Sequence, residues 1–478
     1  MKTKIAIIGA GPGGYVAAIR AAQSGADVTV IEQENVGGTC LNWGCIPSKV
    51  MKATADLAVR CAEAEHFAVK LSGEVATDMA ALMARKARVV DDGIKGIHAL
   101  FDKHGIRHVN GRGRIRDRGT AIVETPDGET LEIPWDRLIL ATGTRPLEIP
   151  AFPFDGEAIL SSNHALSLTA VPESIVIVGG GVIGCEFACI LSALGAKVTV
   201  VEALDRLLPL PSVDPDCSKV LTREMKKRKI KILTDRTVAS AEKTDGGIRA
   251  EIGASPFLPE AKKSKVKPTT VDARKLLICI GRQPLSADLG LETVGVQTDP
   301  KGWIIADERL QTHAEGVYAI GDALGPEKIM LAHVASAEGE VAVENALGGD
   351  RKMDYRAVPS AIFTSPEVAN VGLTEAGAAE AGFDVRADTV LFRSLGKAHV
   401  IGEIAGQAKI VSDKASGRVL GVHIIGPHAT DLIAEGTLAV RKSLTVEEIA
   451  DTIHAHPTLA EIMSETAFKG IDRPLHAI

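Results

Sequence analysis

The strongest constraint on the fold of this 478-residue chain is a unit of strand, glycine-rich turn, helix and second strand that occurs twice. In the first copy the apolar run 5–8 leads into the pattern G-x-G-x-x-G, and the strand after the helix ends in an acid. The residues concerned are Gly9, Gly11, Gly14 and Glu32. Such glycines let a pyrophosphate approach the helix N-terminus, and the acid accepts from a ribose 2′-hydroxyl. The sequence therefore predicts a dinucleotide-binding unit.

The second copy lies 170 residues further on, as Gly179 does from Gly9, and keeps the same spacing. Its glycines and terminal acid are Gly179, Gly181, Gly184 and Glu202. A single glycine pattern is a weak signal, but the repeat of all its parts indicates two dinucleotide sites. An acid in the position of Glu202 would repel a 2′-phosphate and favours NAD over NADP. The nearby Arg206 is the one cationic feature that argues in the other direction.

Each copy is followed by a buried strand, at 137–141 and again at 275–279. Each of these strands leads into a turn that contains a glycine and a proline. We therefore expect an α/β fold with two Rossmann-like domains, the second inserted in the first, and a C-terminal α+β domain. The expected divisions are 1–150, 151–281, 282–350 and 351–478. A further strand, 317–320, leads to Asp322, whose carboxylate is expected to bond a cofactor's polyol chain or else to cap a helix.

Cys40 and Cys45 stand close together in the sequence G-T-C-L-N-W-G-C-I-P-S-K. A bridge across so few residues closes a very small loop and would stabilise little, so its expected value is chemical. Pro47 predicts the start of a helix through Lys49 to about Arg60, and a thiolate at Cys45 would be stabilised by that helix N-terminus. The alternatives are two buried core cysteines or half of a zinc site, although a second pair with metal-ligand spacing is missing from the sequence.

Composition narrows the class of partner. The chain has 54 Lys and Arg against 61 Asp and Glu, a formal net charge of −7, and lacks a basic run interleaved with aromatics. Nucleic acid is therefore not expected as a partner. The run 4–8 is needed as a strand, and apolar runs stay well short of the ~18–20 residues of a membrane span. We expect a cytoplasmic protein without a membrane span, in which Cys185 and Cys189 are packing residues.

The C-terminal region contains a second chemical cluster, H-A-H-P-T-L-A-E. We expect strands over 408–412 and 419–425 and helices over 431–442 and 446–453. Glu461 follows His456 by five residues; a carboxylate on one ring nitrogen would fix the tautomer and raise the basicity of the other. The pair is a candidate proton acceptor, with ordinary surface polar residues as the alternative. His454 is expected to have a supporting or structural place.

Taken together, the dithiol, the repeated nucleotide unit and the C-terminal H-A-H-P resemble the flavin-dependent disulfide reductases. Within them the chain is similar to the dihydrolipoamide dehydrogenases. The resemblance covers nearly the whole chain and includes G-V-I-G-C-E and V-H-I-I-G-P-H-A-T-D-L-I-A-E. It implies FAD and NAD as cofactors, a homodimer formed by the C-terminal domain, and no metal.

The resemblance also assigns roles to residues. It implies an FAD site at Gly9, Gly11, Gly14, Glu32, Lys49, Gly143 and Asp322. It implies an NAD site at Gly179, Gly181, Gly184, Glu202 and Gly281. Lys49 would pair with Glu186 near the flavin, Cys40 would exchange with substrate, and Cys45 would contact the flavin. His456, held by Glu461, would act on the dithiol of the partner subunit.

The expected reaction is the oxidation of protein-bound dihydrolipoamide with hydride transfer to NAD. The alternatives are a glutathione reductase-like enzyme and a noncatalytic assembly subunit. A mercuric reductase would carry a C-terminal cysteine pair, whereas the last cysteine here is Cys279. A lipoyl-bearing domain is not expected before Lys4, so the lipoyl group should come from a multienzyme partner. That partner is a 2-oxo acid dehydrogenase, glycine cleavage or acetoin cleavage system.

Overall fold

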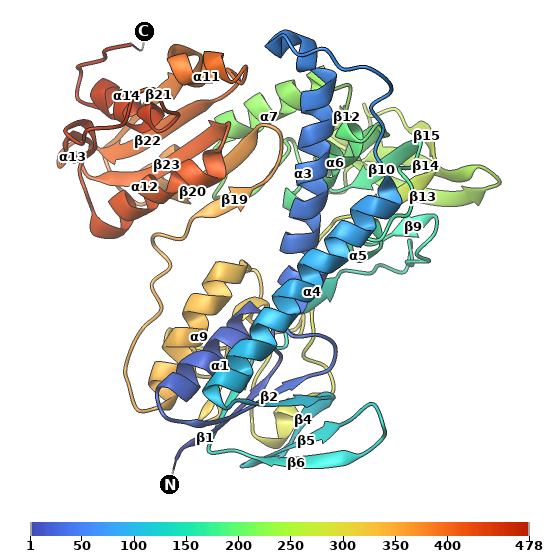
Figure 1. The fold of residues 1–478 in the computed structure, drawn as a ribbon, viewed down its shortest axis with the longest axis vertical. Coiled ribbons are helices and arrows are strands. Elements are labelled where there is room, and N and C mark those ends of the chain that lie inside the picture. Colours follow the sequence, from blue (N-terminus) through green and yellow to red (C-terminus); the bar gives the residue numbers. More distant parts are fainter. Residues whose placement is uncertain (1, 477–478) are drawn as a thin grey trace. The chain divides into compact units, whose positions relative to one another are not determined.

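A computed structural model describes residues 2–476, shown in Figure 1. Contacts divide the chain into two units. The first contains the residues up to Met51, Asp78–Leu147 and Gly281–Asp354, and the second contains Lys52–Thr77, Glu148–Ile280 and the residues from Tyr355 on. The second unit groups the inserted nucleotide domain with the C-terminal domain, so the four-part division expected from the sequence stays a prediction.

The first unit is built on a five-stranded parallel sheet of order β18-β7-β1-β2-β3. Its strands are β1 (Lys4–Ile8), β2 (Asp27–Glu32), β3 (Arg107–Asn110), β7 (Arg137–Leu140) and β18 (Val317–Ala319). Helices α1 (Pro12–Gln23) and α9 (Ala332–Ala346) pack together on one face. The antiparallel strands β4 (Arg112–Asp117), β5 (Thr120–Glu124) and β6 (Thr130–Pro134) contribute apolar side chains to the same core.

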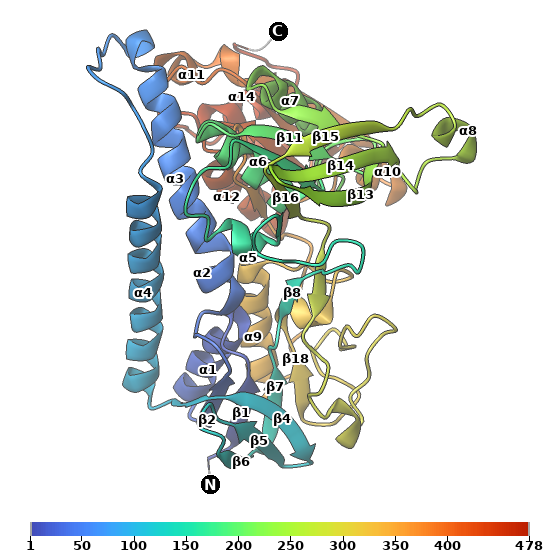
Figure 2. The same cartoon turned by 90° about the vertical axis from the view of Figure 1, so that its right-hand side faces the viewer.

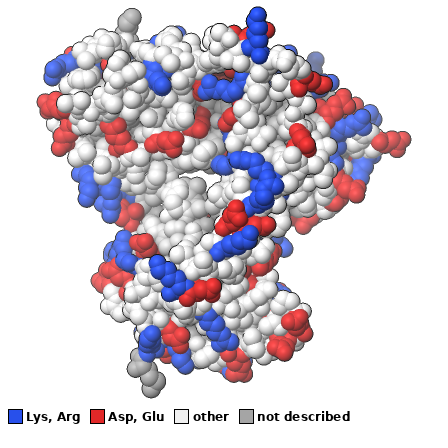
Figure 3. Space-filling model, viewed as in Figure 1, with Lys and Arg blue, Asp and Glu red and all other residues white. Residues whose placement is uncertain are grey.

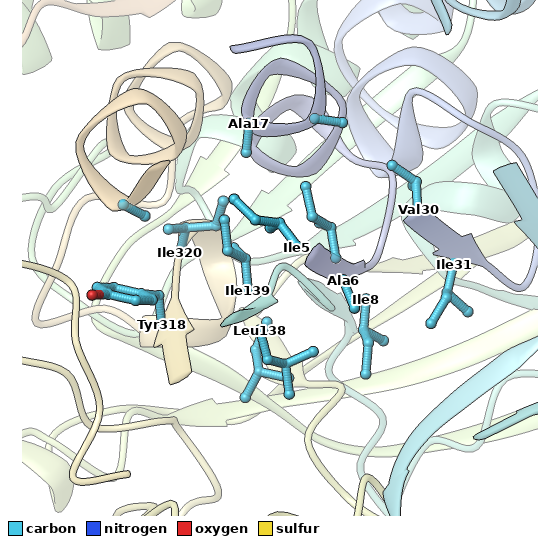
Figure 4. Close-up of a cluster of buried hydrophobic side chains, with 14 of the residues drawn as sticks. Ile5, Ala6, Ile8, Ala17, Val30, Ile31, Leu138, Ile139, Tyr318 and Ile320 are labelled. Atoms are coloured by element: carbon cyan, nitrogen blue, oxygen red, sulfur yellow. The ribbon is translucent and has the colours of Figure 1, made fainter. Parts of the chain in front are cut away.

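Coverage of both faces explains why the central strands β1 and β7 are apolar and buried after their first residue. Figure 4 shows Ile5 and Ile139 pointing toward the helix that carries Ala17, while Ile8 and Leu138 point to the opposite face. All five side chains are at most 5% exposed. Neighbouring strands therefore share two apolar layers, which fixes the pairing of Ile5 with Arg137 and of Ile8 with Leu140.

The second nucleotide unit repeats this arrangement, with the strand order β12-β11-β10-β16-β9. Its strands are β9 (Ile159–Leu160), β10 (Ser174–Val178), β11 (Lys197–Val201), β12 (Lys231–Leu233) and β16 (Lys275–Ile278), and α6 (Val182–Ala193) follows β10. Strand β10 pairs with β11 and β16 just as β1 pairs with β2 and β7. All these strands fall between β7 and β18 in the sequence. The expected insertion of the second nucleotide-binding unit in the first is therefore confirmed.

An antiparallel sheet of β13 (Arg236–Thr244), β14 (Gly247–Ala254) and β15 (Thr269–Ala273) completes this unit. Figure 2 shows the connection between β14 and β15 extending away from the sheet. This connection includes the short helix α8 (Glu260–Lys263). On the face drawn in Figure 3, lysine and arginine side chains intermingle with acidic ones.

The C-terminal region forms an antiparallel sheet of order β19-β20-β23-β22-β21. Its strands are β19 (Ser360–Ile362), β20 (Glu367–Gly372), β21 (Val385–Leu391), β22 (Gln407–Asp413) and β23 (Val419–Gly426). Helix α12 (Ala429–Lys442) packs on β20 and β23, and α14 (Glu461–Gly470) packs on β21 and β22. Every residue of β23 is buried, as expected for a central strand covered on both faces. The expected α+β domain is confirmed.

One helix end differs from expectation. The helix predicted over 446–453 is α13 (Val446–Ala450), which ends three residues earlier. The Thr452 hydroxyl donates to the Glu448 carbonyl oxygen at 2.8 Å, and this bond closes the last turn where the backbone leaves the helix. Ile453, which would have extended the helix, is 97% exposed. Within residues 2–476, helices fall short of the length and apolar character needed to cross a membrane.

Candidate functional site

The two glycine turns have matching geometry. A Cβ on Gly9 would overlap the carbonyl oxygen of Ala141, just after β7, and one on Gly179 would overlap that of Cys279, just after β16. The middle glycines differ from these: a Cβ on Gly11 would meet its nearest neighbour at 3.9 Å, and one on Gly181 would meet open space within the described chain. The outer glycine thus lets two strands close up, while the middle one leaves room for a phosphate.

The acids at the ends of β2 and β11 are held in the same way. Glu32 accepts from the backbone nitrogens of Ala10, at 2.7 Å, and Glu34, at 2.9 Å. Glu202 accepts from those of Gly180, at 2.5 Å, and Leu204, at 2.7 Å. Each carboxylate oxygen keeps further lone pairs, so both acids can also accept from ribose hydroxyls. The backbone fixes both carboxylates beside their glycine turns.

Arg206 is engaged within its own loop. One terminal nitrogen donates to the Ser218 hydroxyl at 2.6 Å, and the other donates to the carbonyl oxygens of Leu210 and Val213 at 3.0 and 3.2 Å. A guanidinium holding three oxygens would have to release them to bind a 2′-phosphate. The cation that complicated the NAD prediction therefore has a local structural role.

The two candidate redox cysteines lie on consecutive helices. Cys40 is in α2 (Gly38–Trp43), and Cys45 is the first residue of α3 (Cys45–Ala62), which begins two residues before Pro47, where the start was predicted. A hydrogen bond with Cys45 raises the pKa of Cys40, and burial and the negative charge of Cys45 add to that rise. A helix N-terminus stabilises a thiolate in the position of Cys45.

A three-residue cluster lies in the same unit as the dithiol. Asp322, in the 3₁₀-helix Gly321–Leu324, accepts from the Thr144 hydroxyl at 2.9 Å. Arg282 donates to the Thr144 hydroxyl at 2.6 Å and to its carbonyl oxygen at 2.9 Å. Burial lowers the pKa of Arg282, whereas the charges of Asp322 and Cys45 raise it. The N-cap of the 3₁₀-helix is Ile320, so Asp322 is not that cap.

Sequence reasoning missed Thr144 and Arg282. They occupy β8 (Thr144–Pro146) and β17 (Arg282–Pro284), which pair antiparallel and follow the two nucleotide sheets. The available signal was the similarity of A-T-G-T-R-P (141–146) to C-I-G-R-Q-P (279–284), because polar residues just beyond the carboxyl ends of parallel strands are placed to face a ligand. The repeated pattern identified the two turns, but it did not reveal that the side chains of Thr144 and Arg282 are in contact.

The remaining nucleotide candidates are two glycines, Gly143 and Gly281, and the charged residues Lys49 and Glu186. Gly143 and Gly281 have φ angles of +66° and +133°, and a Cβ on either would meet open space within the described chain. Lys49, in α3, donates to the Ser48 hydroxyl at 3.4 Å. Glu186, in α6, is buried and accepts from the backbone nitrogen of Phe363 at 2.9 Å. Lys49 and Glu186 belong to different units, so their pairing stays a prediction.

The second unit brings His456 and Glu461 together. Nδ1 of His456 lies 2.8 Å from Oε1 of Glu461, the first residue of α14, and Oε2 accepts from the backbone nitrogen of Thr458 at 2.9 Å. Burial raises the pKa of Glu461, but the bonds from His456 and Thr458 produce a net lowering. The His456 side chain is 76% exposed. A fixed carboxylate behind an exposed imidazole is the geometry of a general base.

His454 has an acid that the sequence spacing did not reveal. Its Nε2 lies 2.9 Å from Oε1 of Glu435, in α12, and its Nδ1 lies 2.9 Å from the Thr452 carbonyl oxygen. The side chain is 8% exposed, and the bond from Glu435 raises its pKa. Both ring nitrogens are occupied and the ring is buried, so His454 holds the loop before His456 in place.

Comparison with known proteins shows the family to which the chain belongs. Residues 3–339 match the family described as pyridine nucleotide-disulphide oxidoreductase, and residues 358–467 match the dimerisation domain of that family. Over 480 residues the chain is 39% identical to the dihydrolipoyl dehydrogenase of Haloferax volcanii, covering 100% of this chain and 98% of the relative. Over 482 residues it is 41% identical to that of Bacillus subtilis, covering 99% and 98%.

Solved structures of similar fold belong to the same kind of protein. LpdA from Mycobacterium tuberculosis superposes with a TM-score of 0.88 at 30% identity, over 98% of this chain and 99% of LpdA. The Cu(II) complex of RclA, an HOCl-induced flavoprotein disulfide reductase from Escherichia coli, gives 0.84 at 25% identity, over 98% and 99%.

The chain belongs to the pyridine nucleotide-disulphide oxidoreductases. Its full-length relatives carry the name dihydrolipoyl dehydrogenase, so the expected family and enzyme class are confirmed.

Proposed function

We propose that this chain oxidises dihydrolipoyl groups through the Cys40–Cys45 pair, with FAD and NAD as electron acceptors. The observation that carries the proposal is the placement of the pair: Cys40 lies in α2 and Cys45 is the first residue of α3, whose N-terminus stabilises a thiolate. A thiolate stabilised at Cys45 is the better leaving group, so a substrate thiolate is expected to attack Cys40, and Cys45 suits the position next to a flavin.

The residues of the chain fit both dinucleotides. Gly9, Gly11, Gly14, Glu32, Lys49, Gly143 and Asp322 are proposed to hold FAD. Gly179, Gly181, Gly184, Glu202 and Gly281 are proposed to hold NAD. The open middle glycines and the backbone-held acids support both assignments. Bound FAD would supply a two-electron acceptor for the dithiol, and bound NAD would supply the hydride acceptor.

The chain's own chemistry is a thiol–disulfide exchange. A substrate thiolate attacks Cys40 of the oxidised pair; the bond between Cys40 and Cys45 breaks, and Cys45 leaves as a thiolate. The second substrate thiol then attacks the mixed disulfide, which releases the cyclic disulfide product and returns Cys40 as a thiol. His456 accepts the proton that the substrate dithiol loses, and Glu461 stabilises the resulting imidazolium.

We infer that the base and the dithiol come from different subunits. The matched dimerisation domain, residues 358–467, contains both His456 and Glu461. An active site completed by the partner subunit would make the homodimer necessary for activity. The substrate is proposed to be a lipoyl group carried by a 2-oxo acid dehydrogenase, glycine cleavage or acetoin cleavage system. The cytoplasmic location expected from the sequence stays a prediction.

The two alternatives are less well supported. A glutathione reductase-like enzyme would need a cation for the 2′-phosphate of NADP, whereas this chain holds the carboxylate of Glu202 beside its second glycine turn and engages Arg206 in its own loop. A noncatalytic assembly subunit would have no need of Cys40, Cys45 and His456, and the chain retains all three.

The direct test is the reduction of NAD by purified protein supplied with FAD and dihydrolipoamide. Oxidised glutathione with NADPH is the comparison substrate pair. Activity with dihydrolipoamide that is lost in Cys45→Ser supports the proposal. Turnover of glutathione in preference to dihydrolipoamide, or dihydrolipoamide turnover that survives in Cys45→Ser, would overturn it.

A further inference from the structure

The loop between β11 and α7 (Pro215–Lys227) closes over the second glycine turn. The backbone nitrogen of Leu208 donates to the Gly180 carbonyl oxygen at 2.7 Å, and the Leu208 side chain is fully buried. A Cβ on Gly180 would lie 2.7 Å from the side chain of Leu207. The turn and the loop are therefore in direct contact, so the position of the turn depends on the position of the loop.

The first nucleotide unit closes its glycine turn in the same way. There the backbone nitrogen of Gly37 donates at 2.7 Å to the carbonyl oxygen of Ala10, which is the counterpart of Gly180. Leu208 has a φ angle of +48°, which is uncommon for a residue with a side chain and persists only where surrounding contacts hold it. The repeat indicates that the closing loop is part of the nucleotide site in both units.

Arg206 fastens this loop to α7. Its guanidinium donates to two carbonyl oxygens within the loop and to the hydroxyl of Ser218, in the first turn of α7. Ser218 is buried, so its hydroxyl is shielded from water that could compete for the bond. The loop is therefore expected to move with the start of α7.

A residue of the C-terminal sheet holds the start of α7. Nζ of Lys409, in β22, lies 3.0 Å from both carboxylate oxygens of Asp214 and 2.6 Å from Asp216. Asp214 is also the N-cap of α7, because its side chain accepts from the backbone nitrogen of Asp216 at 2.9 Å. Lys409 and Asp214 are both buried, so solvent and salt screen their attraction little. This ion pair joins the C-terminal sheet to the nucleotide unit.

We propose that Lys409 is a positioning residue for the nicotinamide nucleotide: by fixing the start of α7 and the loop bound to it, Lys409 keeps the second glycine turn in the geometry that binds the nucleotide. This inference rests on the proposed function, which puts NAD at that turn. The contacts run from Lys409 to Asp214, from α7 to Arg206, and from the loop to Gly180. Nucleotide affinity thus depends on a residue inside the matched dimerisation domain.

The expected effect is on nucleotide binding and not on the dithiol chemistry. When a site has its binding geometry in only a fraction of the molecules, the apparent Kd rises by the inverse of that fraction. We expect Lys409→Met combined with Asp214→Asn to raise the Kd for NAD by ~5–10-fold. This double variant removes both buried charges, and Asp216, whose side chain is 39% exposed, keeps its bond with Lys219. A loss of affinity therefore reports the missing contact between the C-terminal sheet and α7.

Two single variants serve as controls. Asp214→Asn retains a cap for α7 and leaves Lys409 paired with Asp216, so its Kd for NAD should stay within about twofold of wild type. Arg386→Met breaks another ion pair of the C-terminal sheet, whose partner Asp388 lies on the same strand, β21. It should lower stability and leave the Kd for NAD unchanged, because neither residue contacts α7 through that pair.

The Kd for NAD is measured by isothermal titration calorimetry on the oxidised, FAD-loaded protein. Amide exchange over residues 203–213, followed by mass spectrometry, reports on the loop directly and should be faster in the double variant only. In steady-state kinetics the KM for NAD should rise, while kcat for dihydrolipoamide at saturating NAD should not fall.

A second variant tests the same contacts without disturbing a charge. Ser218→Ala removes one of the three oxygens that hold Arg206, and its affinity for NAD should fall ~2–3-fold. This variant decides the question if the double variant fails to fold.

A double variant that binds NAD within about twofold of wild type would overturn the inference. So would an Arg386→Met protein that loses as much affinity as the double variant, because the loss would then follow from lower stability. If the double variant does not fold, wild-type affinity in Ser218→Ala has the same force. A wild-type protein that fails to bind NAD would show that the proposed NAD site is wrong, and that outcome is distinct from an NAD-binding enzyme whose affinity ignores Lys409.

Discussion

Oε2 of Glu202 lies 2.5 Å from the backbone nitrogen of Gly180, in the middle of the second glycine turn. The carboxylate is 6% exposed and therefore cannot swing into solvent without breaking this bond and that to Leu204. Any nucleotide phosphate placed next to it would meet a buried negative charge.

The first prediction follows from this bond. NAD should be preferred to NADP by at least ~100-fold in kcat/KM, about 2.7 kcal/mol, because a 2′-phosphate would lie against a fixed carboxylate. Glu202→Gln should narrow the preference, chiefly by weakening NAD. The measurement is the ratio of kcat/KM for the two nucleotides. Equal use of NADP by the wild-type protein would refute the role of Glu202.

The second prediction concerns the cysteines. If Cys45 is the flavin-side thiolate, Cys40→Ser should show a long-wavelength charge-transfer absorption without added reductant, and Cys45→Ser should lack it. Both variants should lose dihydrolipoamide oxidation and retain bound FAD. Absorption spectra of the purified variants between pH 5 and 9 provide the check. The band in Cys45→Ser alone would mean that the two sulfurs exchange roles.

The third prediction concerns the base. His456→Gln should lower kcat for dihydrolipoamide by ~10²–10⁴-fold and leave NADH-to-dye transfer nearly unchanged, because only the dithiol step needs a proton acceptor. Glu461→Gln should have a smaller effect, since the Thr458 backbone bond can still orient the side chain. The measurements are the steady-state rates of dihydrolipoamide oxidation by NAD and of dye reduction by NADH. An equal loss in both assays would point to a structural defect.

The fourth prediction tests the shared site. Mixing Cys45→Ser subunits with His456→Gln subunits under conditions of exchange should restore activity. In each heterodimer one site then combines an intact dithiol with an intact base. Activity is followed against the fraction of heterodimer seen by native mass spectrometry. Complete exchange without recovery would put the base and its dithiol on one chain.

The fifth prediction concerns stability. Nζ of Lys409, in β22, lies 3.0 Å from both oxygens of Asp214 and 2.6 Å from Asp216, at the start of α7 (Pro215–Lys227). The side chains of Lys409 and Asp214 are 7% and 2% exposed. Lys409→Met leaves a buried carboxylate unpaired and should cost ~3–5 kcal/mol of unfolding free energy.

The matched control is Lys409→Met combined with Asp214→Asn, which removes both buried charges and should recover part of the loss. Denaturant unfolding of the FAD-loaded protein measures both variants. A double variant less stable than Lys409→Met would show that Asp214 stabilises the fold through groups other than Lys409.

The fold could be predicted because its determinants are local. Glycine spacing, apolar strand runs and terminal acids recur at fixed intervals, and each follows from backbone geometry near the residue concerned. Gly9 and Glu32 could therefore be identified from neighbouring residues alone. The Thr144–Arg282 contact could not, because 138 positions separate the residues and their approach depends on the pairing of β8 with β17.

The same limit applies around the base. Glu461 was identifiable because it follows His456 by five residues with a proline between them. Glu435 reaches His454 from another helix, and His476 reaches Glu465 through a reversal of the chain after α14. Such contacts depend on how elements pack and leave no periodic trace in the sequence. The end of α13 at Ala450 was missed for a related reason, since a single hydroxyl bond decides it.

The insertion of one nucleotide-binding unit in the other determines the order in which the two parallel sheets can be completed during synthesis. Strand β7 ends at Leu140, and its outer neighbour β18 begins only at Val317. Until that later segment leaves the ribosome, β7 is an exposed sheet edge with unpaired backbone groups, which invites association with other chains. The inserted unit carries all the strands of its own parallel sheet between these two points and can fold while the first sheet waits for its last strand. Nascent chains arrested before Val317 should therefore be the aggregation-prone species.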